Sequence, residues 1–179
     1  MRRVRYNCAM SLDGFIADAN DGFDWIVIDP DIDFEELSAQ FDTYLMGRRT
    51  FEVTGSQGSP EAAGIRNYVF SRNLRQCDYQ NVKIIGEDWK EVVRSIRAEP
   101  GKDIWLFGGG RLFGSLCQEG LVDTVEVAVI PILLGDGIPF VAGLSKRVKL
   151  RLTGQRVLEK TGTVILEYEV GRIAVPQER

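Results

Sequence analysis

The run Ile104-Trp105-Leu106-Phe107-Gly108-Gly109-Gly110-Arg111-Leu112-Phe113 combines the patterns of a buried strand, a tight turn and a helix start. Four apolar residues at 104–107 predict the strand, and three consecutive glycines predict its end. Leu112, Phe113 and Leu116 then follow at helical spacing. The run therefore predicts a unit made of a strand, a tight turn and a helix.

The glycine turn of this unit is suited to holding an anion. A helix start leaves several backbone N–H groups without partners, and residues without a Cβ let an anion approach them closely. Neither standard phosphate loop is present, because Gly110 is followed by Arg111 and Leu112, and Phe113 stands where the dinucleotide fingerprint has its third glycine. The turn predicts either a phosphate site or glycines that only pack the helix close to the sheet.

Short apolar runs alternate with helical patterns on both sides of this unit. Strands are predicted at residues 4–12, 15–17, 43–46, 67–70, 82–85, 124–130, 148–158 and 163–170, the first two being one strand interrupted at Asp13-Gly14. Helices are predicted at 34–41 and 88–97. The alternation predicts a three-layer α/β fold with a mostly parallel central sheet. The last two strands, joined at residues 160–162, would add an antiparallel hairpin at one edge.

The length and composition of the chain predict one domain. A chain of 179 residues with 44% hydrophobic content is long enough for one substantial core. We expect this domain at residues 1–172, followed by a tail at 173–179 whose last residues are frayed. Residues 54–64 are small, polar and rich in glycine, which predicts a surface loop.

Charge and hydropathy give no reason to expect nucleic acid or a membrane as a partner. The net charge is −4 and the sequence pI is about 5.0. The basic N-terminus is not followed by an apolar segment, and no later run is long enough to cross a bilayer. The sequence therefore predicts a cytoplasmic protein.

The residue types that are missing restrict the chemistry. Without histidine, the chain lacks the commonest general base and the commonest zinc ligand, so no metal site is predicted. Cys8, Cys77 and Cys117 are odd in number and far apart, which is typical of reduced cysteines. Any proton transfer must use a carboxylate, a tyrosine, a lysine, a thiol or water.

Basic and hydroxyl residues follow two of the predicted strands at the point where each strand ends. They are Gly47, Arg48, Arg49 and Thr50 after one strand, and Ser71, Arg72 and Asn73 after another. Ligands of open parallel sheets gather beyond the carboxyl ends of the strands, where the triple glycine is also expected. The three loops together predict a ligand with several phosphates, such as a phosphorylated dinucleotide. Each arginine taken alone is equally typical of a solvated or carboxylate-paired surface side chain.

Short motifs in a fixed order resemble those of dihydrofolate-reductase-like proteins. They are Ser11-Leu12-Asp13-Gly14-Phe15-Ile16-Ala17, Gly22-Phe23-Asp24-Trp25, Met46-Gly47-Arg48-Arg49-Thr50-Phe51-Glu52, Val69-Phe70-Ser71-Arg72 and Phe107-Gly108-Gly109-Gly110. Within that superfamily, residues 120–123 and 131–140 are most similar to the stand-alone reductase domain of bacterial riboflavin biosynthesis, the RibD C-terminal domain. The resemblance extends from Val4 to Val170.

The resemblance implies an NADPH-dependent reductase and gives a role to each matching position. Gly108, Gly109 and Gly110, with Arg111 and Leu112 at the start of the following helix, would hold the pyrophosphate. Gly47, Arg48, Arg49, Thr50, Ser71 and Arg72 would surround the adenosine side, where arginines favour a 2′-phosphate. Ala9, Ile16 and Ala17 would flank the nicotinamide ring. The protein would supply placement and shielding from water, and the cofactor the hydride.

The substrate side departs from dihydrofolate reductase itself. That enzyme uses a carboxylate on its first long helix and a hydroxyl on a later strand. Here Asp31, Asp33, Glu35 and Glu36 give no unambiguous match, and Ala128 stands near the hydroxyl position. Asp13 and Trp25 are the candidate catalytic residues, and Gly135-Asp136-Gly137 is the candidate substrate-binding loop. Asp-Gly is also ordinary turn chemistry, and Trp25 is equally suited to anchoring a core or a loop.

The resemblance implies a small-molecule substrate and a homodimer. In riboflavin biosynthesis the reductase converts the ribose of a ribosylamino-pyrimidine phosphate, 5-amino-6-(5-phosphoribosylamino)uracil, into a ribityl chain. The chain has neither the length nor the His/Cys pattern for the zinc deaminase domain that usually accompanies this reductase. Reduction of another pyrimidine or a pterin is equally compatible with the motifs. A nucleotide-binding sensor without turnover is a second candidate function, and dihydrofolate reduction is a third.

Overall fold

The computed structural model describes residues 1–55, 64–78 and 82–171. Within them, eight strands form one sheet in the order β5-β4-β3-β6-β1-β7-β10-β9. These strands are β1 (Val4–Ser11), β3 (Phe41–Gly47), β4 (Arg66–Phe70), β5 (Val82–Ile85), β6 (Asp103–Gly108), β7 (Thr124–Ile130), β9 (Leu150–Leu158) and β10 (Thr163–Val170). The other elements are β2 (Phe15–Ala17), β8 (Ile138–Pro139), α1 (Phe34–Ser38), α2 (Arg48–Gly55), η1 (Gln76–Asp78), α3 (Trp89–Ala98) and α4 (Gly110–Gln118).

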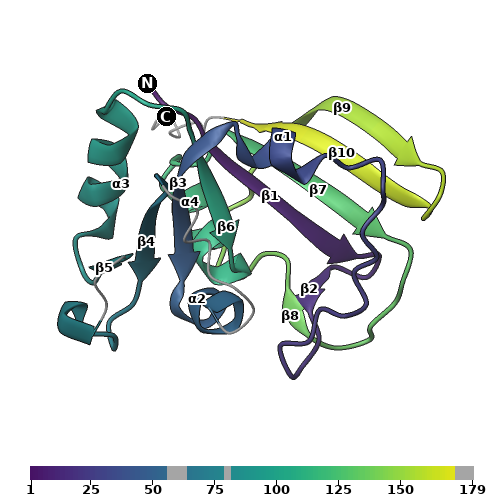
Figure 1. Cartoon of the computed structure of the whole chain (residues 1–179), viewed down its shortest axis with the longest axis horizontal. Helices are drawn as coiled ribbons and strands as arrows, with labels where there is room; N and C mark the ends of the chain where they lie inside the picture. The colour runs from purple at the N-terminus through teal and green to yellow at the C-terminus, as the bar shows by residue number, and fades with distance from the viewer. Residues whose placement is uncertain (56–63, 79–81, 172–179) are drawn as a thin grey trace, which may run out of the picture.

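The strand directions confirm the mostly parallel sheet with a C-terminal hairpin. The six strands from β5 to β7 in the sheet order are parallel to their neighbours, whereas β10 runs antiparallel to both β7 and β9 (Figure 1). The hairpin closes at Gly162, whose N–H donates to the Leu158 carbonyl at 2.8 Å. Its φ of +71° suits glycine.

Helices cover both faces of the sheet, which confirms the three layers. On one face, Val93 of α3 and Phe113 and Leu116 of α4 pack in a cluster that includes Val4 and Tyr6 of β1. On the other face, a smaller aromatic cluster joins helices α1 and α2 to strands β3 and β6. Its members are Phe41, Tyr44 and Met46, with Leu37, Phe51, Ile65, Trp105 and Phe107 packed against them.

Two expected elements differ from the structure by more than one or two residues at their ends. Residues 4–12 and 15–17 are not one interrupted strand, because β2 leaves the main sheet and pairs with β8. The helix expected at 34–41 ends at Ser38, and Phe41 begins β3. The Phe41 ring is buried against Trp105, with its centroid 4.9 Å away, so packing overrides the helical pattern at this position.

Helix α2 and strand β8 are elements that the sequence patterns do not predict. The sequence of α2, Arg-Arg-Thr-Phe-Glu-Val-Thr-Gly, contains β-branched residues and a terminal glycine, which weaken its local helical signal. Of the loop expected at 54–64, residues 56–63 lie outside the described part of the chain, as does the tail at 173–179.

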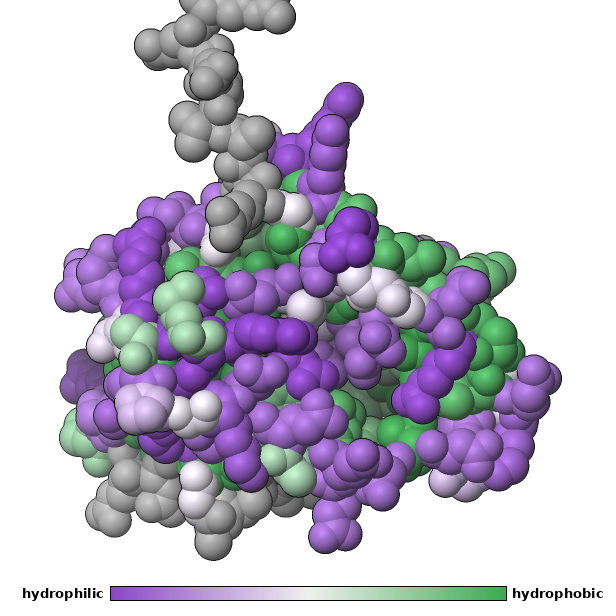
Figure 2. All heavy atoms as spheres, turned by 90° about the horizontal axis from the view of Figure 1, so that it is seen from above, coloured by the Kyte–Doolittle hydropathy of each residue, from purple (hydrophilic) through white to green (hydrophobic). Residues whose placement is uncertain are grey.

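Strand β9 leaves apolar side chains at the free edge of the sheet. Leu150, Leu152 and Val157 are exposed by 44%, 49% and 56%. Figure 2 shows apolar side chains in green on the right of the molecule, the side on which β9 and β10 lie in Figure 1. An exposed apolar edge strand favours pairing with another surface.

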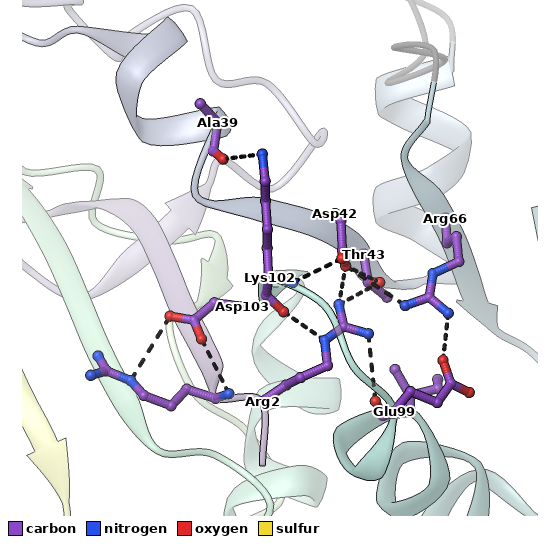
Figure 3. Close-up of polar contacts among 10 residues, drawn as sticks. Arg2, Ala39, Asp42, Thr43, Arg66, Glu99, Lys102 and Asp103 are labelled. Carbon is purple, nitrogen blue, oxygen red and sulfur yellow. Dashed lines mark hydrogen bonds and ion pairs between the residues drawn. The ribbon is translucent and has the colours of Figure 1, made fainter.

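A buried arginine ties the amino-terminal ends of the central strands together (Figure 3). The side chain of Arg2 is only 2% exposed, and it pairs with the Asp42 carboxylate. It also donates to the Lys102 carbonyl at 2.6 Å and to the Thr43 hydroxyl at 2.8 Å. These contacts link the start of β1 to the start of β3 and to the segment before β6.

Asp42 is the charged partner on which this arginine depends. Its partial burial disfavours the carboxylate, but hydrogen bonds from the Thr43 hydroxyl and the Lys102 N–H, with the charges of Arg2 and Arg66, outweigh that effect. The pKa of Asp42 therefore lies below its ordinary value. A carboxyl group of this kind stabilises the fold above its unfolded pKa, and the contribution is lost as pH falls through the folded pKa.

We expect Asp42→Asn to lower the free energy of unfolding by about 2–3 kcal/mol at pH 7, because it leaves a buried guanidinium without its counter-charge. Urea denaturation measures this, with Asp24→Asn, an exposed aspartate, as the control. The difference between wild type and D42N should shrink below about pH 4. A difference that is the same at pH 3 and pH 7 would contradict the role of the charge.

Candidate active site

The carboxyl ends of β4, β3 and β6 lie side by side at one edge of the sheet. Gly47 of β3 pairs with Phe70 of β4, and Met46 pairs with Gly108 of β6. In Figure 1 the arrowheads of β3 and β6 point down toward α2. The three loops that the sequence singles out therefore meet, and a cavity of about 1560 Å³ opens there. It is larger than the roughly 300–1,000 Å³ of most ligand pockets, so it has room for two ligands.

All the residues that the resemblance assigns to a dinucleotide line this one cavity. They are Ala9, Ile16, Ala17, Gly47, Arg48, Arg49, Thr50, Ser71, Arg72, Gly108, Gly109, Gly110, Arg111 and Leu112. They come from β1, β2, α2, α4 and the ends of β3, β4 and β6, so only the tertiary structure brings them together. Their assignment to a cofactor remains a prediction.

The glycine turn leaves the start of α4 open to a ligand. Gly108 has a φ of +137°, which favours glycine, and the peptide bond that joins it to Gly109 is cis. Gly109 is the N-cap and supplies no side-chain hydrogen bond. The bond from the Phe113 N–H to the Gly109 carbonyl, 3.1 Å, is the first of the helix, so the N–H groups of residues 110–112 precede it. Those groups are available to an anion.

The third glycine has a different role from the second. A Cβ on Gly110 would lie 2.2 Å from the Pro139 carbonyl oxygen, whereas a Cβ on Gly109 would meet nothing closer than the Thr50 hydroxyl at 3.4 Å. Gly114, one turn later, is equally close to the Ala142 carbonyl oxygen, at 2.1 Å. Gly110 therefore packs α4 against residues 139–142, as the packing interpretation of the turn requires. Gly109 lines the cavity, and its contact with a phosphate stays a prediction.

Arginines gather on the rim of the cavity. Arg48 lies 3.9 Å from the carboxylate of Glu52, and Arg49 pairs with Asp21. Arg72 and Arg111 are exposed and form no ion pair within the described ranges. Carboxylate pairing thus applies to two of these four arginines, and the remaining two are available to a ligand.

The serine after β4 shapes its own turn. The Ser71 Oγ accepts hydrogen bonds from the N–H groups of Asn73 and Leu74, both at 3.1 Å, and its backbone N–H donates to the Ile85 carbonyl at 2.9 Å. The hydroxyl proton is still available for donation. Ser71 can therefore hold the turn and bind an anion at the same time.

Small residues form the floor of the cavity beside the glycine turn. Ala9 of β1 stands opposite Ala128 of β7. Ile16 and Ala17 of β2 line the cavity next to them. Two methyl side chains in register leave a flat surface on which a planar ring can lie, as the nicotinamide assignment requires.

Asp13 holds a loop in place. Its carboxylate accepts hydrogen bonds from the Ser11 hydroxyl at 2.6 Å and from the N–H groups of Leu134 and Gly135, the latter at 2.7 Å. The bond from Ser11, followed by the bond from Gly135, lowers the pKa of Asp13. Among the described residues that line the cavity, neither Asp13 nor residues 135–137 are found. These contacts favour the turn interpretation of Asp13, and its catalytic role stays a prediction.

Trp25 also lies outside the cavity wall formed by the described residues. Its indole N–H donates to the Gly22 carbonyl at 3.2 Å, so the ring is tied to its own loop. The acidic residues near α1 are engaged as well, since Asp33 accepts from the Glu36 N–H at 2.8 Å and Asp31 pairs with Lys160. None of these contacts tests a role in binding substrate.

Polar residues that belong to none of the motifs line the far end of the cavity. They are Arg5, Asn7, Gln40, Glu126, Arg156 and Glu167. The alternation of Arg5, Asn7 and Ala9 along β1 was the available signal, because side chains two residues apart lie on the same face of a sheet. A glutamate inside the apolar run of β7 was a second signal.

None of the helices in the described part of the chain is long and apolar enough to cross a membrane.

Comparisons with known proteins agree with this fold. The family model described as the RibD C-terminal domain matches residues 2–164. The uncharacterized protein YyaP of Bacillus subtilis (strain 168) is 33% identical over 93% of this chain and 94% of its own length. A crystal structure of a putative riboflavin biosynthesis protein from Shewanella sp. PV-4 has a TM-score of 0.80 at 23% identity and covers 95% of this chain and 99% of that one. Dihydrofolate reductase from Enterococcus faecalis, complexed with NADP(H), has a TM-score of 0.69 at 18% identity over 94% and 96%.

We expect Gly110→Ala to lower the free energy of unfolding by about 1–3 kcal/mol, because the added methyl overlaps the carbonyl of Pro139. Gly109→Ala should keep the stability of the wild type within about 1 kcal/mol, since its methyl makes an ordinary contact. Thermal denaturation of both variants measures the difference. Equal losses at the two positions would contradict the separate roles of these glycines.

Proposed function

This chain belongs to the RibD C-terminal domain family, and from that premise we propose that it is an NADPH-dependent reductase of a small pyrimidine- or pterin-type molecule. One observation carries the proposal: every residue that the motifs assign to the dinucleotide lines the same cavity, at the carboxyl edge of the sheet. A neighbour in fold, the dihydrofolate reductase of Enterococcus faecalis, is described in its solved structure as complexed with NADP(H), which supports the choice of cofactor.

The residues present fit a dinucleotide diphosphate. The open N–H groups at the start of α4 and the Gly109 backbone would hold the pyrophosphate, because the helix dipole adds roughly half a positive charge there. Two arginines of the rim would bind the adenosine end: Arg72, and Arg48, whose contact with Glu52 is long at 3.9 Å and exposed. A 2′-phosphate would make charge-assisted hydrogen bonds with them that a 2′-hydroxyl does not make. The site would therefore bind NADPH more tightly than NADH.

The floor of the cavity would position the nicotinamide ring for hydride transfer. NADPH, when bound, supplies the hydride. Ala9 and Ala128 leave a flat surface on which the nicotinamide would lie, and Ile16 and Ala17 of β2, which line the same cavity, would shield it from water. The substrate would then lie on the same face of the sheet, toward the polar residues at the far end of the cavity. A compound like 5-amino-6-(5-phosphoribosylamino)uracil is the most specific substrate that the family suggests.

Titration of the protein with NADPH and with NADH, monitored by fluorescence, tests the proposal. Candidate pyrimidines and pterins are then added, and the oxidation of the cofactor is followed at its absorbance band. A reductase consumes NADPH, whereas a nucleotide sensor binds it and stops. If no reduced nicotinamide binds, the proposal is wrong.

We also propose that the single domain at residues 1–172 assembles as a homodimer through its β9 edge. The exposed side chains of Leu150, Leu152 and Val157 support this edge as the interface. Homodimers bury such apolar surface between two copies of the same patch.

Arg72→Ala and Arg48→Ala should each reduce the preference for NADPH over NADH by about tenfold or more, because each loses a bond to the 2′-phosphate. Dissociation constants of both cofactors measure this at fixed salt. Arg94→Ala, which removes an exposed arginine of α3 paired with Glu91, is the matched control. An unchanged preference in both rim variants would refute the 2′-phosphate assignment.

Leu152→Lys should shift the protein from dimer to monomer at micromolar concentration. Burial of an unpaired charge in an apolar interface has a large free-energy cost. Sedimentation velocity measures the assembly. Leu133→Lys, at an exposed leucine in the loop before β8, is the control and should remain dimeric. A monomeric wild type would rule out this interface.

A further inference from the structure

Asn7 carries a buried polar atom without a partner. The residue lies inside β1, is 6% exposed and is among the residues that line the cavity. Its amide Nδ2 donates to Glu126 Oε1 at 3.3 Å, while its Oδ1 has no hydrogen-bond partner within the described residues. An unsatisfied buried acceptor is destabilising, so an atom of this kind calls for an explanation.

Glu126 stands directly opposite Asn7 in the pairing of β1 with β7. The carboxyl group is partly buried, and burial first, then the nearby charge of Glu167 on β10, raises its pKa. The guanidinium groups of Arg5 and Arg156 oppose this shift. The cavity therefore contains a partly desolvated carboxyl group next to the free oxygen of Asn7.

The position of this pair relative to the cofactor floor follows from the strand geometry. Asn7 and Glu126 each precede the alanines Ala9 and Ala128 by two residues on the same strands. Residues two apart lie on one face, about 7 Å from each other along the strand. A ring held by Asn7 and Glu126 would therefore lie beside a ring held over the two alanines.

Aromatic and aliphatic groups line the cavity together with the charged side chains that act on Glu126. The Trp105 indole N–H donates to the backbone carbonyl of Asn7 at 3.1 Å. This bond fixes the indole ring beside Asn7 and Glu126. Phe34 and Leu37 from the α1 side and Ile165 from β10 also line the cavity. The Asn7 Oδ1 and the Glu126 carboxylate are two neighbouring hydrogen-bond acceptors beside apolar side chains. They are complementary to a flat ring that carries two neighbouring N–H donors.

We propose that Asn7 and Glu126 bind the substrate by accepting hydrogen bonds from one edge of an amino-substituted heteroaromatic ring. The inference rests on the proposed reductase function and names the substrate contact of the same cavity. The Asn7 Oδ1 takes one N–H donor and the Glu126 carboxylate takes another from a ring nitrogen or an exocyclic amino group. A ring edge without donors would leave the Asn7 oxygen unpaired and the carboxylate poorly solvated.

The inference is tested with two small probes in calorimetric titrations. The first, 2,4-diaminopyrimidine, carries amino donors, and the second, 2,4-dimethylpyrimidine, has nearly the same shape without them. We expect the wild-type protein to bind the diamino probe at least tenfold more tightly. Binding of NADPH is measured separately on the same samples.

Glu126→Gln should weaken binding of the diamino probe about tenfold or more and leave NADPH affinity unchanged, since it removes only the charge of one acceptor. Asn7→Ala should also weaken binding of the diamino probe. If the Asn7→Ala variant does not fold, Glu126→Gln alone tests the inference. Glu169→Gln, which changes an exposed carboxylate of β10 that does not line the cavity formed by the described residues, is the control and should bind as the wild type does.

The outcomes separate this inference from the reductase proposal. A wild-type protein that binds NADPH but binds neither probe, or binds both equally, overturns the inference and leaves the reductase proposal intact. Binding of the diamino probe that depends on Glu126, without any NADPH binding, supports the inference and overturns the reductase proposal. An effect of Glu169→Gln as large as that of Glu126→Gln also overturns the inference.

Discussion

Backbone hydrogen bonds between parallel β3, β4 and β6 put Gly47 beside Phe70 and Met46 beside Gly108. The rest of the site depends on this register, because it brings three loops from distant parts of the chain to one edge. A shift by one residue would turn the buried side chains of β3 to the opposite face. The cavity exists because the strands of one sheet end together.

Polar groups are paired with one another at the amino-terminal edge of the sheet, whereas several are left without partners from the described residues at the carboxyl edge. At the amino-terminal edge, Arg2 and Asp42 satisfy each other and the neighbouring backbone groups, so the edge is closed. At the carboxyl edge, the start of α4 has no side-chain cap, and Arg72 has no ion pair among the described residues. The first arrangement stabilises the fold. The second leaves hydrogen-bonding capacity for ligands.

Much of the fold was predictable because its signals are local. The apolar runs gave β5 at 82–85, β7 at 124–130 and β10 at 163–170 with the bounds that the structure has. The signal failed where tertiary packing decides: Phe41 leaves the helical pattern to pack on Trp105, and α2 forms although its sequence is a weak helix former. For the candidate site, motifs selected the dinucleotide end, whereas Asn7 and Glu126 carry no motif because their partners lie on neighbouring strands.

The sequence by itself determined the class of fold and the glycine turn, and it selected one part of the residues that line the cavity proposed for a dinucleotide. This was possible because strand periodicity, glycine turns and short motifs each depend on residues that are close together in the sequence. Only the tertiary structure decided that Gly110 packs against the Pro139 carbonyl while Gly109 has no such close contact, and that Asp13 holds the 134–135 loop. It also decided that the free oxygen of Asn7 lies beside Glu126. These outcomes depend on contacts between segments far apart in the chain, which only the folded protein brings together.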